Sequence, residues 1–154
     1  MRRWTRSCQA GAVRYLLGLA LAAALLAGKA AAGEGAKLSP EGIRKTMEAY
    51  IAAFNTGDAG AVTALYEDGA TVEDPAGSAP HKGSQEIGQF YDKVCAHGAK
   101  LEPVSINPAP DGSGAMFFQI RMKAATISII DIMTFDATGK ITSMKAYSAI
   151  TPAP

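Results

Sequence analysis

Hydrophobic residues recur at helical spacing in the segment that follows Leu38. Ser39 is a suitable N-cap, Pro40 fits the first helical position, and Gly57 is suited to end the helix. The apolar side chains of this segment lie at offsets of 0, 4, 7, 8 and 11 and form one stripe: Ile43, Met47, Tyr50, Ile51 and Phe54. The pattern predicts an amphipathic helix that packs this stripe against a core.

Two shorter helices are predicted further along the chain. The second runs from a cap at Asp58 to a break at Gly69, and the third from a cap at Ser84 to a break at Gly98. The second helix carries Val62, Leu65 and Tyr66. The third carries Ile87, Phe90, Tyr91, Val94 and Cys95 on one side.

The remaining pattern is typical of strands. Residues 70–74 predict a short strand closed by Pro75, and residues 76–83, with one proline and two glycines, predict a loop. Four longer strands are expected at about 100–106, 115–123, 125–135 and 140–150, with turns at 111–114 and 136–139. Helices followed by a run of strands indicate the α+β class. We expect a curved, mostly antiparallel sheet wrapped over three N-terminal helices, which leaves a conical apolar pocket.

Asp131 is the most informative position, because it interrupts an apolar strand face. Alternation places it beside Ile129 and Met133. A carboxyl group in such surroundings must be paired or must lose its charge. Arg121 and Lys123 on the neighbouring strand are possible partners. The other reading is a neutral acid, which can donate a hydrogen bond at neutral pH.

Two further residues carry candidate chemistry. Tyr50 lies on the buried stripe of the first helix, where its hydroxyl needs a partner or reaches the surface. Asp74 shares its strand face with Val72, so it points into the pocket mouth unless it only starts the turn at Pro75. A carboxylate base opposite two uncharged donors suits proton removal next to a carbonyl, because the donors stabilise the oxyanion that develops.

The first 32 residues have the layout of a secretory signal peptide. Arg2, Arg3, Arg6 and Arg14 precede an apolar run over 15–28, and small residues follow at 30–32. An uncleaved anchor and a mistaken start near Ala36 are the alternatives. We expect a flexible lead over 33–38, a domain over 39–150 and a tail over 151–154. The predicted location is periplasmic or secreted, or cytoplasmic if the start is mistaken.

Removal of the leader changes the charge of the chain. Five of the 15 basic residues lie in residues 1–32, so ten remain against 14 acidic residues, a net charge of −4. No basic stripe is present, which argues against a nucleic-acid partner. Cys8 lies in the leader and Cys95 is then the single cysteine, so no internal disulfide is expected. His81 and His97 are isolated, and no metal-ligand cluster is predicted; after leader cleavage no membrane partner is expected either.

Several stretches resemble bacterial ketosteroid isomerases, also called steroid Δ-isomerases, of the nuclear-transport-factor-2-like and SnoaL-like superfamily. They are Tyr50–Asp58, Thr71–Pro75 with Gly77, Ser78 and Pro80, Ile130–Asp131, and Gly139–Ile141 with Ser143 and Met144. The resemblance implies that Asp74 is the general base and that Tyr50 and Asp131 form the oxyanion hole. It also implies that Tyr66 and Tyr91 support Tyr50 through hydrogen bonds. Ketosteroid isomerase is itself a standard example of carboxyl tuning.

The resemblance further implies a cone-shaped α+β barrel, no cofactor, a homodimer and a small hydrophobic ketone as substrate. The pocket is expected to be lined by Phe54, Val72, Met116, Phe118, Met144 and Ser148, the last replacing a large aromatic residue of the family. The implied reaction moves a C=C bond of a 3-oxo-Δ5-steroid into conjugation with the ketone. A polyketide cyclase and a non-catalytic exported binding module are the alternative functions.

Overall fold

The computed structural model describes residues 37–152, which belong to the unit Ala36–Pro154. The predicted signal peptide over 1–32, with Cys8, lies outside the described residues. So do residues 33–36 of the expected lead and residues 153–154 of the expected tail. Among the described residues, no helix is both long enough and apolar enough to cross a membrane.

Helix α2, Pro40–Thr56, forms as its sequence pattern predicts. The Ser39 hydroxyl accepts a hydrogen bond from the Gly42 amide at 3.2 Å, which satisfies one free donor of the first turn. Gly57 ends the helix at a φ of 81°, a left-handed conformation that glycine adopts without strain. The whole predicted stripe is buried: Ile43, Met47, Tyr50, Ile51 and Phe54.

The other two helices differ from the prediction at their ends. Helix α3 covers only Ala59–Thr63, capped by Asp58, and the predicted continuation through Tyr66 is wrong. Tyr66 instead begins a strand, because its backbone pairs with Ile141 of the last strand. Helix α4, Gly83–Cys95, has Lys82 at its N-cap without a side-chain bond. Ser84, the predicted cap, instead donates to Asp68 Oδ1 at 3.3 Å.

Six strands form one sheet in the order β2-β1-β6-β5-β4-β3. The strands are β1 (Tyr66–Glu73), β2 (His81–Lys82), β3 (Glu102–Pro108), β4 (Ser113–Arg121), β5 (Ala125–Phe135) and β6 (Ile141–Pro152). All pairs are antiparallel except β1 with β6. The two-residue strand β2 lies in the segment predicted as a loop, since two residues are too few for a periodic pattern.

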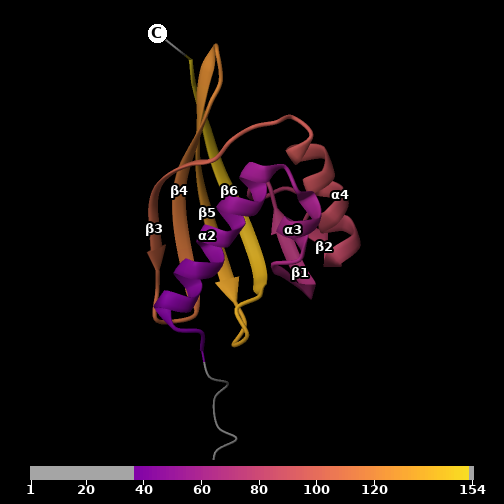
Figure 1. Cartoon of the computed structure of the whole chain (residues 1–154), viewed down its shortest axis with the longest axis vertical. Coiled ribbons are helices and arrows are strands. Elements are labelled where there is room, and N and C mark those ends of the chain that lie inside the picture. The colour runs from indigo at the N-terminus through magenta and orange to yellow at the C-terminus, as the bar shows by residue number, and fades with distance from the viewer. Residues whose placement is uncertain (1–36, 153–154) are drawn as a thin grey trace, which may run out of the picture. The chain divides into compact units, whose positions relative to one another are not determined.

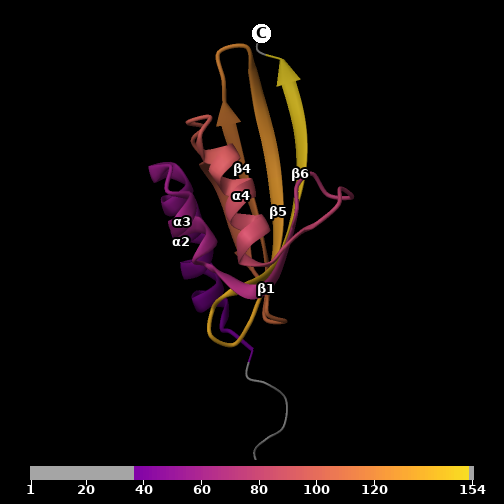
Figure 2. The same cartoon turned by 90° about the vertical axis from the view of Figure 1, so that its right-hand side faces the viewer.

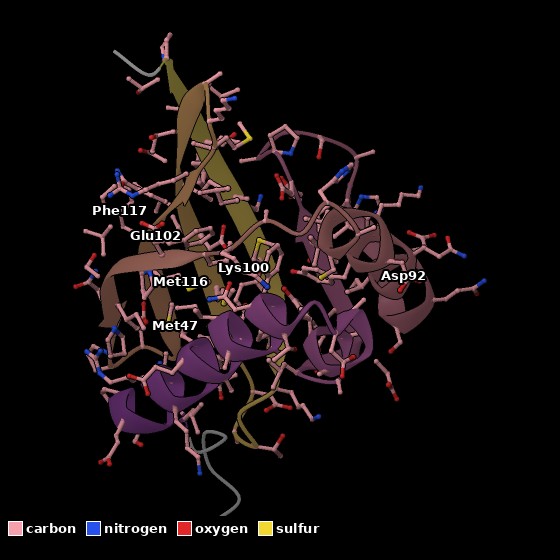
Figure 3. The ribbon with its side chains drawn as sticks, turned by 45° about the horizontal axis from the view of Figure 1, so that its top comes forward. Met47, Asp92, Lys100, Glu102, Met116 and Phe117 are labelled. Atoms are coloured by element: carbon pink, nitrogen blue, oxygen red, sulfur yellow. The ribbon has the colours of Figure 1, made fainter. Side chains whose placement is uncertain are left out.

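Helices α2, α3 and α4 cover one face of the sheet, which curls over them without closing (Figures 1 and 2). The core lies between the two layers, where Met47 of α2 and Met116 of β4 are both buried (Figure 3). Gly114 lets α2 approach β4, because a Cβ there would lie 2.9 Å from Ile43 and from the Met47 sulfur. The ends of β4, β5 and β6 extend beyond the helices, toward the C-terminus in Figure 1. The described unit is therefore α+β with a curled, mostly antiparallel sheet.

Candidate active site

Strand β5 places Asp131 in the interior of the molecule. Its neighbours across the sheet are Met116 on β4 and Ala146 on β6, and all three residues are buried. Asp131 is 1% exposed, and within residues 37–152 neither of its carboxyl oxygens has a hydrogen-bond partner. This is the alternation that the sequence predicts, with the carboxyl on the apolar face.

Neither of the two possible cationic partners, Arg121 and Lys123, is paired with Asp131. Arg121 Nε lies 2.6 Å from Glu102 Oε2 in an exposed ion pair, and its strand position is opposite Thr126. Lys123 is exposed beyond the end of β4. Burial, and next the negative charge of Asp74, raise the pKa of Asp131 well above its usual range. We therefore expect Asp131 to keep its proton at neutral pH and to have an unused donor.

Three tyrosines from three elements meet beside this carboxyl group. Tyr91 of α4 donates to Tyr50 of α2 with an O···O distance of 3.2 Å, and the Tyr66 and Tyr91 hydroxyls lie 2.6 Å apart. Each phenol has one hydrogen, so Tyr66 must be the donor to Tyr91. The Tyr50 hydrogen then remains free for a ligand. Burial is the largest cause that raises the pKa of each phenol well above its usual range, so all three stay neutral.

Asp74 follows the last residue of β1 and lies less deeply than Asp131. The turn after Asp74 is held against β6, because the Ala76 amide donates a hydrogen bond to the Ala146 carbonyl at 2.7 Å. Partial burial raises the pKa of Asp74, and the charge of His81 opposes this rise. Because Asp74 is the more solvated of two interacting carboxyl groups, we expect the negative charge on Asp74 and the proton on Asp131.

These groups share one cavity. The cavity is small, with a volume of about 40 Å³. The polar lining consists of Tyr50, Asp74, Tyr91 and Asp131. The apolar lining consists of Phe54, Phe90, Val94, Leu101, Phe118, Ile120 and Ile129. Such an arrangement can hold a largely apolar ligand with one oxygen toward the inner donors and a carbon next to the base.

Only part of the predicted pocket lining is found at this cavity. Phe54 and Phe118 line it, whereas Val72, Met116 and Met144 are buried in the core behind it. Ser148 is exposed and pairs with Ile129 of β5.

Five lining residues are absent from the pocket that the sequence predicts, although the sequence holds a signal for most of them. Ile129 shares the strand face of Asp131, and Ile120 that of Phe118. Phe90 and Val94 belong to the predicted apolar side of α4. Leu101 lies between α4 and β3, where no periodic pattern exists, and its contact could not be inferred.

The geometry defines an α+β protein of the nuclear-transport-factor-2-like class with an acid, a phenol and a carboxylate in one cavity. Residues 47–144 match the SnoaL-like domain, and this chain belongs to that family. A steroid Delta-isomerase from Nocardioides simplex is 33% identical over 120 residues, which are 72% of this chain and 97% of that protein.

A solved structure extends the likeness in fold. It is the epoxide hydrolase/cyclase-like enzyme SalBIII, described for pyran ring formation in the polyether salinomycin. It matches with a TM-score of 0.67 and 22% identity, over 72% of this chain and 95% of SalBIII. Together with the isomerase, the family match supports an enzyme activity of the isomerase or cyclase type.

Proposed function

We propose that this chain is a cofactor-independent isomerase that converts a 3-oxo-Δ5-steroid into the conjugated 3-oxo-Δ4-steroid. The observation that supports it most directly is the buried, unpartnered Asp131, which shares a cavity with Tyr50 and Asp74. A binding module has no need for an uncharged acid with a free donor. The similarity to a steroid Delta-isomerase supports the same reaction.

The reaction follows from the three groups. The Asp74 carboxylate removes a proton from the carbon between the carbonyl and the double bond, and the electrons move onto the carbonyl oxygen. Tyr50 and Asp131 donate hydrogen bonds to the dienolate oxygen as its charge develops. Asp74 then returns the proton to the far end of the former double bond. The base ends as it began, so the cycle uses no external reductant, oxidant or acid.

The apolar lining contributes to the same step. Phe54, Phe90 and Phe118 exclude water from the donors, and hydrogen bonds are stronger in such surroundings than in bulk water. The donor chain from Tyr66 through Tyr91 to Tyr50 polarises each hydroxyl in turn. This places the strongest donor of the three where the ligand oxygen would bind.

The test is an ultraviolet assay for enone formation from 5-androstene-3,17-dione with the purified chain. A matched control substrate is the saturated 3-ketone, which cannot form an enone. We expect enone absorbance to rise catalytically with the first substrate and not with the second. A rate equal to the buffer background would contradict the proposal and favour the cyclase alternative or the binding module.

We further propose that two copies pair through the outer face of the sheet. Ile130, Ile132 and Tyr147 point away from the helices with 45%, 45% and 50% exposure. They lie next to one another on β5 and β6, and a shallow hollow beside them is lined by Phe117, Ser128, Ile130, Tyr147, Ser148 and Ala149. Contiguous apolar surface of this kind is typical of subunit interfaces.

The Tyr147→Lys variant should therefore be monomeric in analytical ultracentrifugation at a concentration where the unmodified chain is dimeric. A lysine charge in the centre of an apolar interface would have to be desolvated without a partner. Gln85 is an exposed residue of α4, so Gln85→Lys is the matched control and should stay dimeric. A monomer for the unmodified chain at high micromolar concentration would contradict the pairing.

A further inference from the structure

His81 belongs to β2, which pairs with the part of β1 that leads to the candidate base Asp74. Strand β2 runs antiparallel to β1, and its register places His81 opposite Val72. Side chains two residues apart share a strand face, so Val72 and Asp74 point to the same side. His81 is thus the diagonal neighbour of Asp74, a relation in which long side chains interact.

A ring contact connects His81 to the cavity. Its imidazole lies on the Phe90 ring with centroids 4.9 Å apart and an interplanar angle of 30°. Phe90 lines the cavity together with Asp74, and it packs edge-on against Tyr91. The stack therefore holds the half-buried imidazole against a residue of the cavity lining.

Several other charged or titratable groups belong to the elements packed around Asp74. Tyr50, Tyr66 and Tyr91 are neutral phenols, and Asp131 is the protonated acid of the interior. On the opposite face of β1, Glu73 is paired with Lys145 at 2.8 Å. On the helix side, the Glu86 carboxylate accepts from the backbone amide of exposed Lys82 at 2.8 Å. Histidine is the side chain that ordinarily changes charge between pH 5 and 8.

We propose that His81 is a positioning residue for the base, whose protonated imidazole keeps the Asp74 carboxylate ionised in mildly acidic solution. This inference rests on the proposed role of Asp74. A nearby cation favours the charged form of a carboxylate, and the charge of His81 acts in this direction by lowering the pKa of Asp74. The consequence is that isomerisation extends to lower pH than the half-buried Asp74 would allow alone.

The pH profile of kcat/KM tests the proposal with three variants. His81→Gln removes the charge, and we expect the acid limb to move upward by about 0.5–1 pH unit, as for a partly screened charge pair. His81→Lys keeps a permanent charge and should leave the acid limb at or below that of the unmodified chain. His97→Gln, an exposed histidine after α4, is the control and should not move it.

The two His81 variants separate charge from stacking, because both lose the ring on Phe90. If glutamine and lysine give the same acid limb, His81 is a structural residue and the proposal is wrong. A direct ¹³C NMR titration of the Asp74 carboxyl group, assigned with Asp74→Asn, needs no turnover. An unchanged Asp74 titration in His81→Gln overturns the His81 inference. A shifted titration without steroid turnover supports the His81 inference and overturns the proposed function instead.

Discussion

Asp74→Asn is expected to isomerise 5-androstene-3,17-dione about 10²–10⁴-fold more slowly than the unmodified chain, the range that a positioned acid-base group contributes. Asparagine has nearly the same shape as aspartate, but its amide cannot accept the substrate proton. The half-buried position at the end of β1 tolerates the uncharged amide, so the fold should persist. The measurement is kcat from the enone assay.

The adjacent residue provides a matched control. Glu73 precedes Asp74 by one position and faces the other way, where it is paired with Lys145. Glu73→Gln removes a carboxylate of the same β1 segment and should change kcat by no more than a few-fold. Equal losses in the two variants would show that any negative charge near the end of β1 supports the reaction. If Asp74→Asn were about as active as the unmodified chain, Asp74 could not be the base.

The second large effect is expected at the two inner donors. Tyr50→Phe and Asp131→Leu should each lower kcat by about 10²–10³-fold, the usual loss for one oxyanion-hole donor. Because these hydrogen bonds strengthen as charge develops on the oxygen, kcat and kcat/KM should fall together while KM changes little. A rise in KM with an unchanged kcat would mean that the donors only bind the substrate.

Graded variants distinguish donation from shape. Asp131→Asn keeps an uncharged N–H donor in the same place, and we expect its loss to be clearly smaller than that of Asp131→Leu. Tyr66→Phe removes the far end of the tyrosine chain, which does not line the catalytic cavity, and its loss should be smaller than that of Tyr50→Phe. If Asn and Leu at position 131 were equally damaging, the loss of a hydrogen-bond donor would not explain the slower reaction.

Much of this architecture follows from local patterns. The stripe on α2 and the alternation around Asp131 are strong because buried and exposed positions repeat regularly over many residues. The turn over 136–139 is also confirmed, since Asp136 Oδ1 accepts from the Thr138 and Lys140 amides at 2.8 and 2.9 Å. Each of these features depends on residues that are close in the sequence.

The parts that could not be inferred depend on pairing between distant segments. The register of β1 with β6 is irregular between Tyr66 and Thr71. The alternation of buried and exposed residues is therefore interrupted there, and the apolar spacing of Leu65 and Tyr66 fits a helix instead. Its parallel pairing with β6 joins segments about 70 positions apart, as in Val72 with Met144. The position of His81 beside Asp74 exists only because β2 pairs with β1.

The candidate site shows the same division. The strand and helix patterns identify Asp131 and Tyr50 as interior polar groups, but their joint cavity with Asp74 is a property of the folded sheet. Ser148 illustrates the limit most clearly. Its strand parity matches that of buried Ala146, which predicts an inward position, yet the structure leaves Ser148 exposed.

The ionisation state of Asp131 in the resting protein decides whether two uncharged donors stand opposite one carboxylate. It can be measured by ¹³C NMR of aspartate-labelled protein, with Asp131→Asn and Asp74→Asn to assign the two carboxyl signals. We expect a protonated Asp131 and an ionised Asp74 in the same sample at pH 7. A spectrum in which Asp131 is ionised at pH 7 would contradict the mechanism.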